Sequence, residues 1–188
     1  MSNATNCILF VGVGSPHGDD RAGWLVADAL AADAPPGVSI RKASVPMNLL
    51  DWLDGIAFLA VCDACRGGGP AGMVQRFDWT GSAEPRNTPV IPALARLRTS
   101  GSHAFGLSAV LELAHRLGRL PRRVVVWGIE GQTFEPGDDL SPQVQCGVPA
   151  MATAIRGELS QATAARAGGR GGRTHQAKEG SNDAFPSN

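Results

Sequence analysis

The chain has 188 residues, of which 43% are hydrophobic and 18% are charged. This length predicts one domain with a substantial core, and the composition is too apolar for a disordered protein. The 17 basic and 17 acidic side chains balance, so neither a nucleic acid nor a membrane surface is an expected partner. The N-terminus lacks a signal-peptide pattern, no apolar run is long enough to span a membrane, and the four cysteines form no secreted-type framework. We therefore expect a cytoplasmic protein.

The first third of the chain alternates between apolar strands and helical segments. Residues 7–13 are a continuous apolar run, which is typical of a strand buried on both faces. The helix predicted after them has a broad apolar face. Residues 38–45 alternate as a more exposed strand does, and residues 48–55 predict one or two helical turns. Residues 56–64 are a second wholly apolar strand, which ends in the carboxylate of Asp63.

The middle of the chain holds a third strand and a long connection. A turn rich in glycine precedes residues 73–79, which alternate as a strand does. Residues 80–101 are rich in proline, serine, arginine and threonine, a long connection of the kind that often carries function. His103 begins a segment in which apolar residues recur at helical spacing up to residue 118.

The last predicted elements are a strand and a helix. Residues 122–130 form the final clear strand, and Ser141 followed by Pro142 is a helix start with a capping hydroxyl. We expect that helix to end near residue 160. Residues 161–188 are rich in glycine, alanine and polar residues without periodicity, which predicts a disordered, low-complexity tail.

Strands that alternate with helices predict an α/β fold. We expect a three-layer sandwich, in which a mostly parallel, twisted sheet carries helices on both faces. The whole fold would be a single domain over residues 1–160.

Three chemically active side chains follow the predicted strands or begin a predicted helix. Ligands of parallel α/β sheets bind outside the carboxyl ends of the strands. Asp20 follows the first strand, Asp63 ends the strand at residues 56–64, and His103 begins a later helix. If the two strands are neighbours, both carboxylates face one crevice, and His103 can point into it. Two carboxylates and an imidazole could bind a divalent metal such as zinc or nickel and leave positions open.

Each of these residues also has an ordinary structural explanation. Asp19 is best explained as a helix N-cap, which leaves Asp20 unexplained because capping needs one residue only. Asp63 could accept hydrogen bonds from the turn after its strand, and His103 could simply begin a helix. Taken singly, the structural explanations are the stronger ones, and the hypothesis of a metal site depends on the three residues together.

Four other residues are weaker candidates. Cys62 and Cys65 have the spacing of a redox pair, but they span a strand end and no helix can begin in the glycine-rich turn that follows. We interpret Cys62 as a core residue and Cys65 as incidental. His17 is expected in solvent, and Glu130, at the end of a strand, could line the crevice.

The motifs that carry these residues resemble those of the hydrogenase maturation proteases, over about residues 8–155. The first motif of that family is a strand followed by a turn with spaced glycines and two acids. The second is a strand that ends in Val-Asp-Ala before a Gly/Pro turn, and the third is Ser-His before a helix. The matching stretches here are GVGSPHGDDRAG at 12–23, AVCDACRGGGPAG at 60–72, SHAFGLSAVLELA at 102–114 and VVVWGIEGQTFEPGDDLSPQV at 124–144.

This resemblance implies an endopeptidase that acts as a monomer on the precursor of the large subunit of nickel–iron hydrogenase. It would remove a C-terminal extension after nickel has been inserted. Asp20, Asp63 and His103 occupy the positions of the family's metal-binding and catalytic residues. The nickel would be supplied by the substrate, and no organic cofactor is implied.

Two alternatives come from other functional classes. A protein of the same fold could sense nickel, or bind it as a metallochaperone does, without cutting a substrate. A nucleotide- or phosphate-binding α/β enzyme is the other alternative. The acidic first turn argues against it, because Asp19 and Asp20 stand where a phosphate would need backbone N–H groups.

Overall fold

The computed structural model describes residues 7–79 and 106–170. These residues form a five-stranded sheet in the order β2-β1-β3-β5-β4. Neighbouring strands are parallel except for β4, which lies antiparallel to β5 at one edge. The strands are β1 (Cys7–Val13), β2 (Val38–Ala43), β3 (Ile56–Cys65), β4 (Val74–Trp79) and β5 (Arg123–Glu130).

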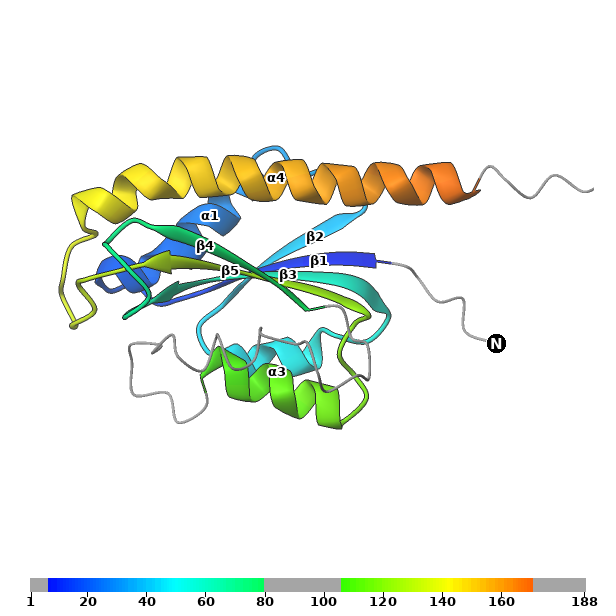
Figure 1. The fold of residues 1–188 in the computed structure, drawn as a ribbon, viewed down its shortest axis with the longest axis horizontal. Coiled ribbons are helices and arrows are strands. Elements are labelled where there is room, and N and C mark those ends of the chain that lie inside the picture. The colour runs from blue at the N-terminus through cyan, green and yellow to red at the C-terminus, as the bar shows by residue number, and fades with distance from the viewer. Residues whose placement is uncertain (1–6, 80–105, 171–188) are drawn as a thin grey trace, which may run out of the picture.

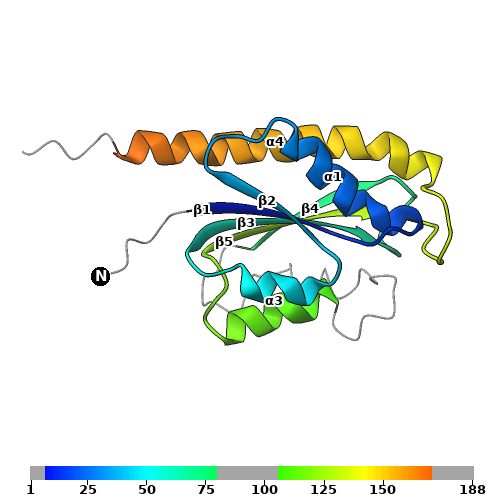
Figure 2. The same cartoon turned by 180° about the vertical axis from the view of Figure 1, so that it is seen from behind.

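Helices cover both faces of the sheet (Figures 1 and 2). The helices α1 (Ala22–Ala31) and α4 (Pro142–Arg170) pack together on one face. The helix α3 (Leu107–Arg116) and the 3₁₀ helix η2 (Pro46–Asp51) lie on the other, and a second 3₁₀ helix, η1 (Gly18–Arg21), directly precedes α1. The predicted three-layer α/β sandwich with a mostly parallel sheet is therefore confirmed.

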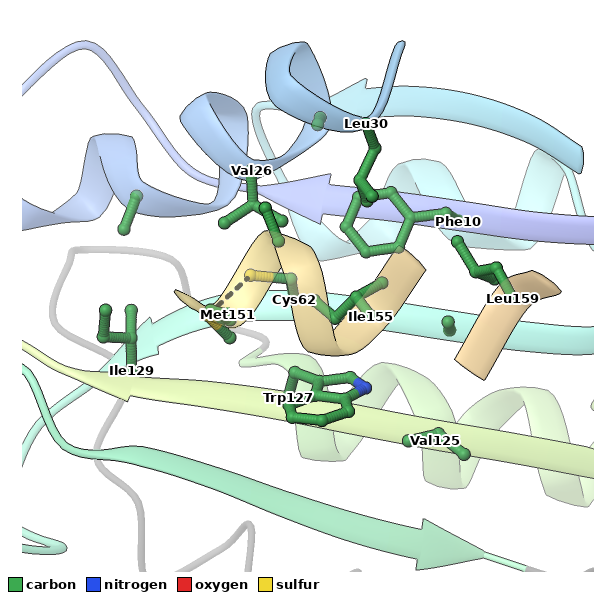
Figure 3. Close-up of a cluster of buried hydrophobic side chains, with 14 of the residues drawn as sticks. Phe10, Val26, Leu30, Cys62, Val125, Trp127, Ile129, Met151, Ile155 and Leu159 are labelled. Atoms are coloured by element: carbon green, nitrogen blue, oxygen red, sulfur yellow. Dashed lines mark hydrogen bonds between the residues drawn. The ribbon is translucent and has the colours of Figure 1, made fainter. Parts of the chain in front are cut away.

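The central strands are apolar because both of their faces are covered. Side chains of β1, β3 and β5 alternate between two buried clusters, one beneath α1 and α4 and one beneath α3 and η2. Figure 3 shows the first cluster, in which Cys62 of β3 points toward Met151 of α4 with 3.8 Å between the two sulfur atoms. The interpretation of Cys62 as a core residue is confirmed, since its side chain is fully buried.

The start of the last helix is confirmed, but its predicted end is wrong. The Ser141 hydroxyl accepts a hydrogen bond from the Val144 amide at 3.4 Å, which is the expected N-cap, and Pro142 is the first helical residue. The helix continues to Arg170 instead of ending near residue 160. Residues 161–170 include several alanines, the residue with the strongest helix propensity, so they extend the helix that the core has already begun.

The strand order creates a switch point between β1 and β3. The connection that leaves β1 returns to β2 on one side, through α1, whereas the connection from β2 crosses to β3 on the other side, through η2. Connections that diverge in this way leave a crevice at the carboxyl ends of the two strands, where α/β proteins bind ligands. Within the described residues, no helix combines the length and the apolar character needed to cross a membrane.

Candidate active site at the carboxyl ends of β1 and β3

Glycines allow the turn after β1 to pack backbone against backbone. A Cβ atom on Gly23 would lie 1.9 Å from the carbonyl oxygen of Val13, and a Cβ atom on Gly14 would lie 2.1 Å from the carbonyl oxygen of Asp20. No residue other than glycine fits at these two positions unless the backbone moves. The close approach holds η1 over the end of the sheet, where it contacts β3.

Asp20 and Asp63 come together at the switch point. The strands that carry them are direct neighbours, with Gly12 of β1 opposite Cys62 of β3, as the expectation of a common crevice requires. Asp63 is 7% exposed and Asp20 is half-buried. Burial raises the pKa of Asp63 well above its usual value, and the negative charge of Asp20 raises it further, against a smaller opposing effect of the Ala64 amide.

Two carboxylates in this arrangement repel each other, and the repulsion is strong because one of them is buried. A divalent cation bound between them, or a proton held by one of them, would relieve it. Carboxylate oxygens are suitable ligands for a divalent ion, and they can also accept a proton from water. The chemistry of the pair therefore fits either a metal-binding or a proton-transfer role.

The third predicted residue, His103, lies outside the described residues. It precedes Gly106, the N-cap of α3, and α3 begins at the edge where β3 and β5 end (Figure 1). Among residues 7–79 and 106–170, no group of three or more His, Cys, Asp and Glu side chains could hold a metal ion. The assignment of Asp20, Asp63 and His103 as a metal-binding trio thus stays a prediction.

Asp19 does not cap α1, so the explanation expected for it is wrong. The residue before α1 is Arg21, which makes no capping hydrogen bond. Asp19 is fully buried, and its carboxylate accepts hydrogen bonds from the amides of Gln132 (2.8 Å), Thr133 (3.1 Å) and Ser141 (2.7 Å). Burial alone would raise the pKa of Asp19, but these hydrogen bonds outweigh it and lower the pKa below its usual value.

Glu130 has a comparable role at the end of β5. It is 3% exposed, and its carboxylate accepts hydrogen bonds from the Gly67 and Gly68 amides in the turn after β3. The Cys65 thiol lies 3.6 Å from the same carboxylate. Burial, together with this neighbouring negative charge, raises the pKa of Cys65 to about 12. Instead of lining a crevice with a free carboxylate, Glu130 binds a turn.

Sequence reasoning missed these two roles because the partners are far apart in the chain. Asp19 and Gln132 are separated by 113 positions, and Glu130 and Gly67 by 63. No local pattern marks such contacts. The available signals were an unexplained pair of adjacent acids, and an acid at the end of an otherwise apolar strand.

The fold and this pair of carboxylates can be compared with known proteins. A model of the hydrogenase maturation protease family matches residues 43–158, which is more than half of the chain. The chain belongs to this family. It is accordingly a peptidase. The matched range contains Asp63 and His103 but begins after the turn that carries Asp20.

Solved structures of similar fold agree with this membership. The hydrogenase maturating endopeptidase HybD from Escherichia coli is 22% identical with a TM-score of 0.66, over 83% of this chain and 93% of that one. The hydrogenase 2 maturation peptidase from Thaumarchaeota archaeon SCGC_AB-539-E09 is 26% identical with a TM-score of 0.57, over 81% and 97%. The maturation protease HycI from Thermococcus kodakarensis KOD1 is 18% identical with a TM-score of 0.60, over 83% and 93%. A comparison with curated protein sequences finds no match.

Proposed function

We propose that this hydrogenase maturation protease removes a C-terminal extension from the nickel-loaded precursor of a nickel–iron hydrogenase large subunit. Two observations support the proposal. One is the family to which the chain belongs, and the other is the position of Asp20 in η1 against β3, the strand that carries Asp63. The second carries more weight for the mechanism. The two carboxylates lie at the β1–β3 switch point, which is where α/β proteins bind their ligands.

In this proposal the nickel ion is part of the substrate. Asp20, Asp63 and His103 would contact the nickel that the precursor already holds, so that an unloaded precursor lacks the group they recognise. The protease itself needs no organic cofactor. Contact with the ion would also bring the adjacent peptide bond toward the two carboxylates.

Hydrolysis of that bond requires an activated water molecule. The water oxygen attacks the carbonyl carbon, the C–N bond breaks, and the proton lost by the water reaches the leaving amine. Two kinds of group at this edge could assist: the substrate's metal ion, by polarising the carbonyl or the water, and a carboxylate, by accepting the proton.

The direct test is a cleavage assay with a defined precursor. The protein is incubated with nickel-loaded large-subunit precursor, and the released C-terminal peptide is detected by mass spectrometry. The same precursor without nickel serves as the control and should remain intact. If the loaded precursor forms a stable complex with the protein in size-exclusion chromatography but is never cut, the protein is a non-catalytic nickel-sensing binder and the proposal fails.

A further inference from the structure

One segment of the chain contacts both turns that carry the candidate carboxylates. We call residues 130–141, which join the end of β5 to the start of α4, the brace. The Asp19 carboxylate accepts hydrogen bonds from three backbone amides of the brace. Hydrogen bonds between the two backbones reinforce this contact. The Asp19 amide donates to the Thr133 carbonyl at 2.7 Å, and the Gly18 amide donates to the Asp138 carbonyl at 2.9 Å. The turn after β1 is therefore bound to the brace by several hydrogen bonds.

The turn after β3 is bound to the same segment. Besides the hydrogen bonds from Gly67 and Gly68 to Glu130, the Arg66 guanidinium donates to the Gln132 carbonyl at 2.8 Å. Arg66 also lies over the ring of Phe134, 4.7 Å from its centroid. The side chain of Glu130 and that of Arg66 thus anchor the chain directly after Asp63.

Asp19 and Glu130, the two acids that bind the turns to the brace, are not accessible to a substrate. Asp19 is fully buried and Glu130 is 3% exposed, and their carboxylates are occupied by backbone amides. Hydrogen bonds to a charged, buried group are worth more than neutral ones, and leaving the amides without an acceptor would be unfavourable. The brace therefore constrains both turns strongly.

We propose that Asp19 and Glu130 are positioning residues, which set the separation of Asp20 and Asp63 by anchoring both turns to the brace. Asp19 is the direct neighbour of Asp20 in η1, a 3₁₀ helix of four residues, so a shift of Asp19 moves Asp20 with it. Glu130 acts on Asp63 through the turn that follows β3. This inference rests on the proposed protease function.

The test compares variants of the two acids with matched controls from the same segment. Asp19→Asn and Glu130→Gln keep the size of each side chain and replace one acceptor oxygen with an NH₂ group. Asp139→Asn and Glu135→Gln change exposed acids of the brace and serve as controls. Steady-state cleavage of nickel-loaded precursor is measured for each protein, and circular dichroism gives its folded fraction at the assay temperature.

We expect kcat per folded molecule to fall about 10- to 100-fold in Asp19→Asn and in Glu130→Gln, the range seen when groups that orient metal ligands are changed. KM should change less than kcat does, because the surface that docks the precursor outside these two turns is intact. The two control variants should match the wild type. Asp19→Ala, which has no acceptor oxygen, should be less active than Asp19→Asn, in which one remains.

The results separate the two proposals. A folded Asp19→Asn or Glu130→Gln protein with kcat within about twofold of the wild type would remove that residue from the positioning role, because a residue needed for stability alone does not change the activity of folded molecules. If Asp19→Asn does not fold, Glu130→Gln carries the test independently, since its contacts lie in the other turn. A wild-type protein that cuts no loaded precursor would instead refute the proposed function, and the positioning role with it.

Discussion

A Cβ atom on Gly12 would lie 2.0 Å from the carbonyl oxygen of Gly23. The end of β1 and the start of α1 are therefore in direct backbone contact, and this contact sets the place of the turn that carries Asp20. We predict that Gly12→Ala lowers the free energy of unfolding by roughly 2–3 kcal/mol, since the added methyl group must displace backbone. Urea denaturation of the purified proteins measures the difference.

Gly157 provides the control for this substitution. It lies exposed in α4, and apart from the neighbouring backbone of its own helix no atom lies within 4 Å of the place that a Cβ atom would occupy. Gly157→Ala should raise the free energy of unfolding by up to about 1 kcal/mol, because alanine favours a helix more than glycine does. Equal stability of Gly12→Ala and the wild type would show that the two segments can separate without loss.

Substitutions in the candidate trio of Asp20, Asp63 and His103 are expected to abolish cleavage. Asp20→Ala and His103→Ala should abolish release of the C-terminal peptide, since each removes a proposed contact to the substrate's nickel, while the circular dichroism spectrum stays that of the wild type. His115→Ala is the matched control, because His115 is an exposed histidine of α3, and it should cut normally. A fully active His103→Ala protein would exclude that residue from the site.

Replacement of Asp63 is expected to have opposite effects on stability and on activity. Its carboxylate is buried beside the negative charge of Asp20, which is unfavourable for folding at neutral pH. We expect Asp63→Asn to raise the free energy of unfolding of the free protein by about 0.5–2 kcal/mol, as substitutions of strained functional groups often do, and to abolish cleavage. Thermal unfolding at pH 7 checks this, with Asp139→Asn expected to leave stability unchanged. A less stable Asp63→Asn protein would mean that the carboxylate stabilises the fold.

The cysteines differ in their predicted reactivity. Cys146 is exposed on α4, whereas Cys65 is buried with a pKa raised to about 12. The thiolate is the reactive form, so iodoacetamide at pH 8 should modify Cys146 rapidly in the folded protein and leave Cys65 unmodified. Mass spectrometry of peptides locates the label, and all four cysteines should react in denaturant. Rapid labelling of Cys65 in the native protein would show that β3 and its turn open readily.

The strands could be predicted because burial on both faces requires uninterrupted apolar runs. Residues 7–13, 56–64 and 122–130 have this pattern, and they became the three central strands of the sheet. The helix start at Ser141 could also be predicted from local sequence, since a capping hydroxyl followed by proline favours a helix start. The end of α4 could not be placed, because no glycine or proline breaks the alanine-rich stretch before residue 168.

The sequence by itself determined the family, the alternation of strands and helices, and which acids follow which strand, because these properties depend on residue type and on spacing along the chain. Only the tertiary structure decided that β1 and β3 are neighbours, that Asp63 is buried within reach of the charge of Asp20, and that Asp19 binds backbone amides instead of capping a helix. Such contacts join positions far apart in the chain. Their geometry follows from how the sheet, the helices and the brace pack together, which no local stretch of residues specifies.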